Sequence, residues 1–102
     1  MPRVNNYEIE FMLVVGTCNI KETTAQWIDN QINSSQPELI IYPKESFGWF
    51  IPVPPDAELL NDWETVPSEL GMIIAYAMGK GCHWVMFDRD ALPIKELPTF
   101  DW

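Results

Sequence analysis

The stretch His83–Leu92, HWVMFDRDAL, decides the fold because it supplies the last strand. Its apolar run stops at two aspartates, Asp88 and Asp90, and short apolar runs bounded by turn residues are typical of buried strands. Successive strand residues point to opposite faces of a sheet. We therefore expect Val85 and Phe87 on one face and Trp84 and Met86 on the other.

The Asp88 and Asp90 pair has two interpretations. An apolar strand followed by D-x-D resembles the first motif of haloacid-dehalogenase-type phosphohydrolases, in which one aspartate attacks phosphorus, the other handles protons and magnesium bridges them. No lysine–acid cluster follows in this chain, and aspartate commonly forms turns because its side chain accepts from nearby backbone N–H groups. We therefore predict a turn. A small metal-dependent hydrolase that uses Asp88 and Asp90 is the alternative.

The segments before this strand predict a β-α-β-β-α-β order. The expected elements are a strand over Tyr7–Val15 that becomes buried on both faces, a helix from Asn19 to about Asn33, strands over Glu38–Tyr42 and Phe47–Val53, and a helix from about Pro67 to the Gly79–Gly81 stop. Asn19 and Glu22 have the spacing of a capping box for the first helix, and Thr65 is a candidate cap for the second.

This order predicts the α+β class and a ferredoxin-like arrangement. We expect a four-stranded antiparallel sheet with two helices on one face, and the first and last strands side by side at its centre. A chain of 102 residues supports one modest core, so residues 1–102 are predicted to form a single domain.

Charge restricts the partners. Fifteen acids against six bases give a net charge of -9, which repels nucleic acid phosphates and favours a basic protein surface. Apolar runs long enough for a membrane span or a signal peptide are missing, so we expect no membrane partner and a cytoplasmic location. Nucleotide-binding glycine motifs are also missing, and Cys18, Cys82 and His83 lack metal-ligand spacing, so no cofactor and no metal are expected.

The segment Pro54–Glu69 is the compositional outlier, since it is rich in acids and has no basic residue. Long loops of this kind are often functional. The predicted partner-binding residues are four acids and the tryptophan among them: Asp56, Glu58, Asp62, Trp63 and Glu64. The carboxylates would mimic phosphates or pair with Lys/Arg of the partner, and the indole would be an apolar anchor. The alternative is a solvated loop whose tryptophan covers the edge of the core.

Several motifs together resemble a family of small domains found in genes of phages, plasmids and integrative elements. They are "GTCNI" after the first strand, "Y…FGW…VP" in the hairpin, "P-x-x-L" at Pro67, "A…G…W…FDRDA" over 77–91 and a terminal "LP-x-aromatic-x-W". The resemblance covers most of the chain and assigns no catalytic residue. Relatives tend to have a histidine near position 19, where this chain has Asn19, which argues against a mechanism shared through that histidine.

The resemblance implies a bacterial host, in which small acidic proteins of mobile elements often disable defence complexes. Together with the charge, it predicts a non-enzymatic inhibitor of a host defence or nucleic-acid-handling complex, of the anti-CRISPR or anti-restriction type. The inhibitor would present its acidic surface to a basic channel as a DNA mimic. It would be a monomer or a homodimer, and a homodimeric accessory domain that pairs through its sheet is a further alternative.

Overall fold

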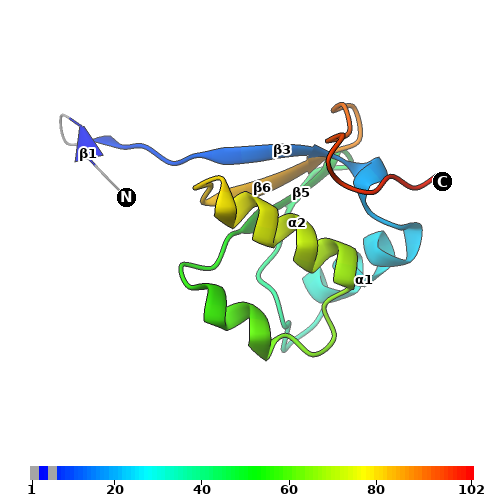
Figure 1. Ribbon diagram of the computed structural model, residues 1–102. Helices are drawn as coiled ribbons and strands as arrows, with labels where there is room; N and C mark the ends of the chain where they lie inside the picture. The colour runs from blue at the N-terminus through cyan, green and yellow to red at the C-terminus, as the bar shows by residue number, and fades with distance from the viewer. Residues whose placement is uncertain (1–2, 5–6) are drawn as a thin grey trace.

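The structure is a computed structural model that describes the backbone of residues 3–4 and 7–102 and the side chains of 8–61 and 63–102 (Figure 1). Its body is a four-stranded sheet in the order β3-β6-β5-β4. The bounds are Met12–Gly16 for β3, Tyr42–Lys44 for β4, Gly48–Pro52 for β5 and Trp84–Asp88 for β6. A short hairpin of β1 (Arg3–Val4) and β2 (Tyr7–Glu8) projects away from this body.

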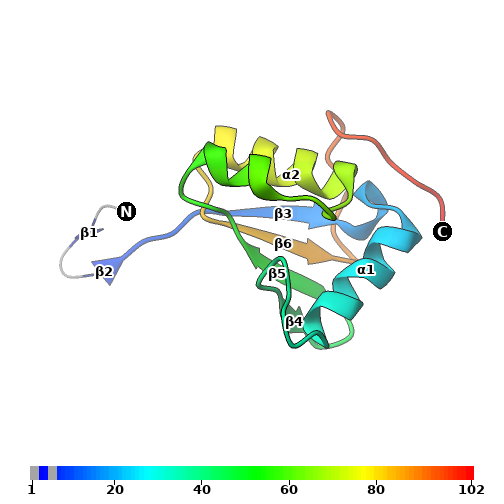
Figure 2. The same ribbon diagram turned by 90° about the horizontal axis from the view of Figure 1, so that it is seen from below.

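Two helices, α1 (Glu22–Ile32) and α2 (Ser68–Gly79), lie on the same face of the sheet (Figures 1 and 2). Two 3-10 turns, η1 (Thr17–Asn19) and η2 (Ala57–Asp62), precede them. The predicted α+β class and β-α-β-β-α-β order of the body are confirmed. The core between sheet and helices is made of fully buried apolar side chains, chiefly Val15, Ile51, Val85 and Phe87 from the strands and Ile28, Leu70, Ile73, Ile74 and Ala77 from the helices.

The sheet differs from the prediction in the direction and place of its strands. The first and last strands of the body, β3 and β6, are side by side as expected, but they run parallel, so the sheet is mixed. The hairpin β4–β5 lies on the far side of β6, which leaves β6 inside the sheet and β3 at its edge. After α2 the chain enters the sheet between β3 and β5. There β6 runs antiparallel to β5 and parallel to β3.

Two predicted strands are wrong in part. The expected strand Tyr7–Val15 is divided into β2 and β3, and Val14 on β3 is 46% exposed because the helices cover only one face of this edge strand. Of the expected strand Glu38–Tyr42, only Tyr42 lies in a strand, as the first residue of β4. The rest is an irregular connection, because the N–H groups of Glu38 and Leu39 donate to the side-chain oxygen of Gln31 rather than to a neighbouring strand.

The predicted caps of both helices are also wrong. Asn19 does not cap α1, since the N-cap position belongs to Lys21 and has no side-chain cap. The carboxylate of Glu69 replaces it: Oε2 accepts from the backbone N–H of Lys21 at 3.0 Å and from the hydroxyl of Thr24 at 2.5 Å. Pro67 stands at the N-cap of α2, and Thr65 instead donates its hydroxyl to Glu38. The acceptor at the start of α1 therefore comes from a residue far away in the sequence, whereas the local pattern predicted one from a neighbouring residue.

Glu69 makes stability depend on pH. Burial raises the pKa of this carboxyl, but the hydrogen bonds from Thr24 and Lys21 outweigh burial and leave the pKa below its usual 4.5. A lowered pKa in the folded state means that the stabilisation is present above pH 4.5 and is lost as pH falls through the lower folded value. We expect Glu69→Gln to cost about 1–2 kcal/mol at pH 7.

Urea unfolding of the wild type and of Glu69→Gln at pH 7 and pH 3 measures this effect. The difference between the two proteins should shrink at pH 3, because the unfolded wild-type chain binds a proton at this carboxyl more readily than the folded protein does. Glu96→Gln is the control, because Glu96 is exposed and should show no comparable difference. An equal difference between wild type and Glu69→Gln at both pH values would contradict the assignment.

Candidate functional site

The two aspartates after β6 form a turn. Oδ1 of Asp88 accepts from the backbone N–H of Asp90 at 2.8 Å, and Oδ2 accepts from Nζ of Lys44 at 2.6 Å. The hydrogen bond from Lys44, with that from Asp90, lowers the pKa of Asp88 and keeps it ionised. The predicted turn is confirmed. Among the side chains that the structure describes, no three of His, Cys, Asp or Glu are grouped so that they could hold a metal ion.

The predicted acidic residues lie on and beside η2. Asp56 caps this turn, because its Oδ1 accepts from the backbone N–H of Glu58 at 2.9 Å. Glu58 and Glu64 are exposed, and their carboxylates make no hydrogen bond or ion pair with any described residue. The side chain of Asp62 lies outside the described residues. Three of the predicted carboxylates are thus placed, and two of these are free to meet a partner.

Trp63 is half-buried against the core and lines an open groove of about 510 Å³. Leu59, 43% exposed, and Ile40, 61% exposed, also line it. The remaining lining residues come from the Glu38–Leu39 connection and from the run that leaves β5: Glu38, Leu39, Pro52, Val53, Pro54 and Pro55. We call this hollow, together with Asp56, Glu58 and Glu64 of the neighbouring loop, the acidic groove. None of the lining residues is a lysine or an arginine.

Glu38 fastens the loop to the groove. Its carboxylate accepts from the hydroxyl of Thr65, from the N–H of Thr65 at 3.2 Å and from the N–H of Glu64 at 2.8 Å. The hydroxyl of Thr65 contributes most to lowering the pKa of Glu38, which therefore remains charged. The sequence interpretation missed Glu38, Ile40 and Leu59. Glu38 and Ile40 belong to the β-rich run after Pro37 that was predicted as a strand, and Leu59 lies in the loop of which only the acids and Trp63 were predicted to bind.

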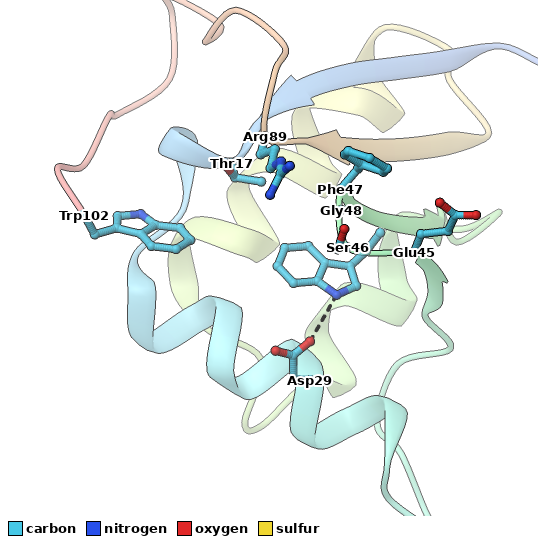
Figure 3. A pocket seen from close by; sticks show the side chains of 9 residues that line it. Thr17, Asp29, Glu45, Ser46, Phe47, Gly48, Arg89 and Trp102 are labelled. Carbon is cyan, nitrogen blue, oxygen red and sulfur yellow. Dashed lines mark hydrogen bonds between the residues drawn. The ribbon is translucent and has the colours of Figure 1, made fainter.

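A second hollow, of about 350 Å³, lies where β3 and β6 end (Figure 3). The parallel register places Gly16 beside Asp88, so the residues that follow, Thr17 and Arg89, meet at one edge of the sheet. Asp29 of α1, the Glu45–Trp49 turn and Trp102 complete the lining. We call this hollow the edge pocket. None of these residues is among the partner-binding residues predicted from the sequence.

The two indoles of the edge pocket are held by hydrogen bonds. Nε1 of Trp49 donates to Oδ1 of Asp29 at 3.2 Å, and Nε1 of Trp102 donates to the carbonyl of Ile20 at 2.8 Å. Trp49 also meets Phe87 edge to face, with ring centroids 6.4 Å apart. Both rings therefore have fixed orientations before any ligand arrives.

Comparison with known proteins gives one match. No curated protein and no solved structure matches the chain. No helix within the described residues is long and apolar enough to cross a membrane. Residues 12–102, which include β3 through β6 and both hollows, match the model of a family described as "Family of unknown function (DUF5983) C-terminal domain". The chain therefore belongs to the DUF5983 family.

Proposed function

We propose that the protein is a non-enzymatic binding module whose acidic groove takes a basic segment of a partner protein. The observation that carries the proposal is an open apolar hollow whose lining has one carboxylate, Glu38, and no base, beside a loop that exposes Glu58 and Glu64. Exposed apolar surface in a hollow marks interaction sites, and acidic residues beside it select a partner that carries Lys or Arg.

The groove provides both parts of such a contact. An apolar or aromatic side chain of the partner would enter between Leu59 and Trp63, where it leaves water. Lysines or arginines beside it would meet Glu58 and Glu64, whose carboxylates have no partner of their own among the described residues. Glu38 adds a carboxylate that stays ionised at neutral pH. The net charge of -9 would speed the approach of a basic surface.

The partner class we propose is a host complex that handles nucleic acid. Such complexes carry basic channels for phosphate backbones, including the channel that holds the guide–target duplex in RNA-guided nucleases. A protein with this charge and groove would occupy the channel in place of DNA. This makes it an inhibitor of the anti-CRISPR or anti-restriction type, in agreement with the mobile-element setting that the sequence motifs imply.

Reversal of the two free carboxylates tests the proposal. We expect the wild type to block DNA binding by a member of a panel of guide-loaded Cas9-type nucleases and restriction endonucleases, measured by fluorescence anisotropy of labelled DNA. Glu58→Lys/Glu64→Lys should weaken inhibition by about 100-fold or more, because it opposes like charges. Inhibition by the wild type should also fall steeply with salt once its effect on DNA binding is subtracted.

The matched control is Glu22→Lys/Glu96→Lys, which changes exposed acids outside the groove. Each replacement adds two charges, so both double variants shift the net charge from -9 to -5. The control should inhibit nearly as well as the wild type. If both double variants lost inhibition equally, net charge alone would explain the loss and the groove would have no specific role. If the wild type inhibited no member of the panel, the proposed partner class would be wrong.

A further inference from the structure

We propose that the edge pocket is a second binding site, which takes a small ligand with a flat aromatic ring, an amino group and one anionic group. The pocket is built from the residues that follow β3 and β6, from β5 and the turn before it, from α1 and from Trp102. It shares no lining residue with the acidic groove. The inference therefore stands independently of the proposed function.

Arg89 is the anion-binding group of this site. Its guanidinium lies over the ring of Phe47, 4.9 Å from the centroid, and its backbone N–H donates to the carbonyl of Phe47 at 2.9 Å. The guanidinium makes no hydrogen bond or ion pair with any described residue, and it acts on Asp88 only through its field. A stacked guanidinium with free N–H groups is suited to a planar carboxylate or a phosphate. In so acidic a chain, an arginine without a bonded carboxylate is notable.

The ring of the ligand would lie between the two indoles. Trp49, Trp102 and Arg89 line the same hollow, and Figure 3 shows the Arg89 side chain directed into it. The N–H groups of both indoles are already engaged, so the pocket presents aromatic surface rather than donors. Aromatic surface of this kind favours flat rings through offset or edge-to-face contacts.

The two acids of the edge pocket, Asp29 and Glu45, determine which further groups the ligand can carry. Only one oxygen of Asp29 accepts from Trp49, so the other can accept from an amino group of the ligand. Asp29 and Glu45 also oppose a second anionic group, which limits the ligand to one such group. The volume of about 350 Å³ lies in the small-molecule range of roughly 300–1,000 Å³.

The position of the pocket in the fold agrees with this assignment. Ligands of open sheets gather outside the carboxyl ends of parallel strands. Here β3 and β6 supply the only parallel pair among the described strands, and the pocket lies at their carboxyl ends. Close approach of β5 to β6 beside the pocket depends on Gly48, because a Cβ there would lie 1.7 Å from the carbonyl oxygen of Phe87.

Four probes test the ligand class: AMP, p-aminobenzoate, adenosine and inorganic phosphate. Binding is measured by titration calorimetry and by tryptophan fluorescence, which the two indoles of the pocket should report. We expect AMP or p-aminobenzoate to bind at least about tenfold more tightly than adenosine, which lacks the anionic group, and phosphate, which lacks the ring and the amino group. Tighter binding of AMP would identify the anionic group as a phosphate, and tighter binding of p-aminobenzoate would identify it as a carboxylate.

Two variants test the assigned roles, and their urea unfolding curves show that each is folded. Arg89→Gln should weaken the preferred ligand by about tenfold or more, while Lys95→Gln, which removes an exposed lysine outside the pocket, should not. Asp29→Asn keeps an acceptor for Trp49 and should improve binding of ADP, which carries a second phosphate group, relative to AMP. No binding of either aromatic anion, or equal affinity in wild type and Arg89→Gln, would overturn the proposal.

Discussion

Gly48→Ala is expected to prevent the protein from reaching its native fold. An added Cβ would lie 1.7 Å from the carbonyl oxygen of Phe87 and 2.6 Å from its carbonyl carbon. Both atoms belong to the backbone of β6, the strand between β3 and β5, so neither can move without disturbing both neighbours. The expected cost is about 4 kcal/mol or more, a large part of the roughly 5–15 kcal/mol that stabilises a small domain.

Circular dichroism and urea unfolding followed by tryptophan fluorescence measure this loss. Gly71→Ala is the matched control, because nothing lies within 4 Å of a Cβ at this position inside α2. It should stabilise the protein by roughly 0.5–1 kcal/mol, since glycine is a poor helix former. Replacing glycine by alanine is therefore expected to lower the free energy of unfolding at position 48 and to raise it at position 71. A well-folded Gly48→Ala protein would contradict the close approach of β5 to β6.

Asn19→Ala is expected to have the second largest effect, at about 3 kcal/mol. Asn19 is fully buried and makes three hydrogen bonds to the C-terminal segment. Its Nδ2 donates to the carbonyls of Pro98 at 2.8 Å and Ile94 at 3.3 Å, and its Oδ1 accepts from the N–H of Ile94 at 2.9 Å. Alanine would leave these backbone groups without partners and release the segment that carries Trp102.

Urea unfolding gives the free energy, and protease digestion reports whether the C-terminal segment is released. Asn19→Asp tests the hydrogen-bond directions, since it keeps one acceptor but turns a carboxylate toward two carbonyl oxygens, and should be worse at pH 7 than at pH 4. Asn33→Ala is the control: its exposed amide donates to the carbonyl of Asp29 at 3.1 Å, and we expect a change within about 0.5 kcal/mol. Equal effects at positions 19 and 33 would contradict the assigned role of Asn19.

The element types could be predicted from the sequence because they depend on local periodicity. The run around Val85 and Phe87 is a strand with these two side chains buried, and the stripe with Leu70 and Ile73 is the buried side of α2. The strand neighbours and the helix caps could not be predicted in the same way. They depend on contacts between residues far apart, such as Glu69 with Lys21, which leave no trace in sequence spacing.

The same distinction applies to the candidate sites. The exposed acids Glu58 and Glu64 were recognisable because composition alone marks their loop. The sequence did not reveal the apolar lining of the acidic groove or any part of the edge pocket, because each hollow brings together several segments that are distant in the sequence. Arg89 in particular reaches the edge pocket only because β6 runs parallel to β3, and the sequence order suggested an antiparallel sheet.

The place of β6 between β3 and β5 also sets an order for folding during synthesis. Until Trp84–Asp88 leaves the ribosome, β3 has no neighbour in the body of the sheet and β5 has only β4. The apolar sides of both helices then have no complete sheet to cover, and such unfinished surfaces are what chaperones recognise. Long-range pairing of this kind also slows folding. Translation of this domain must therefore be nearly complete before its core can close.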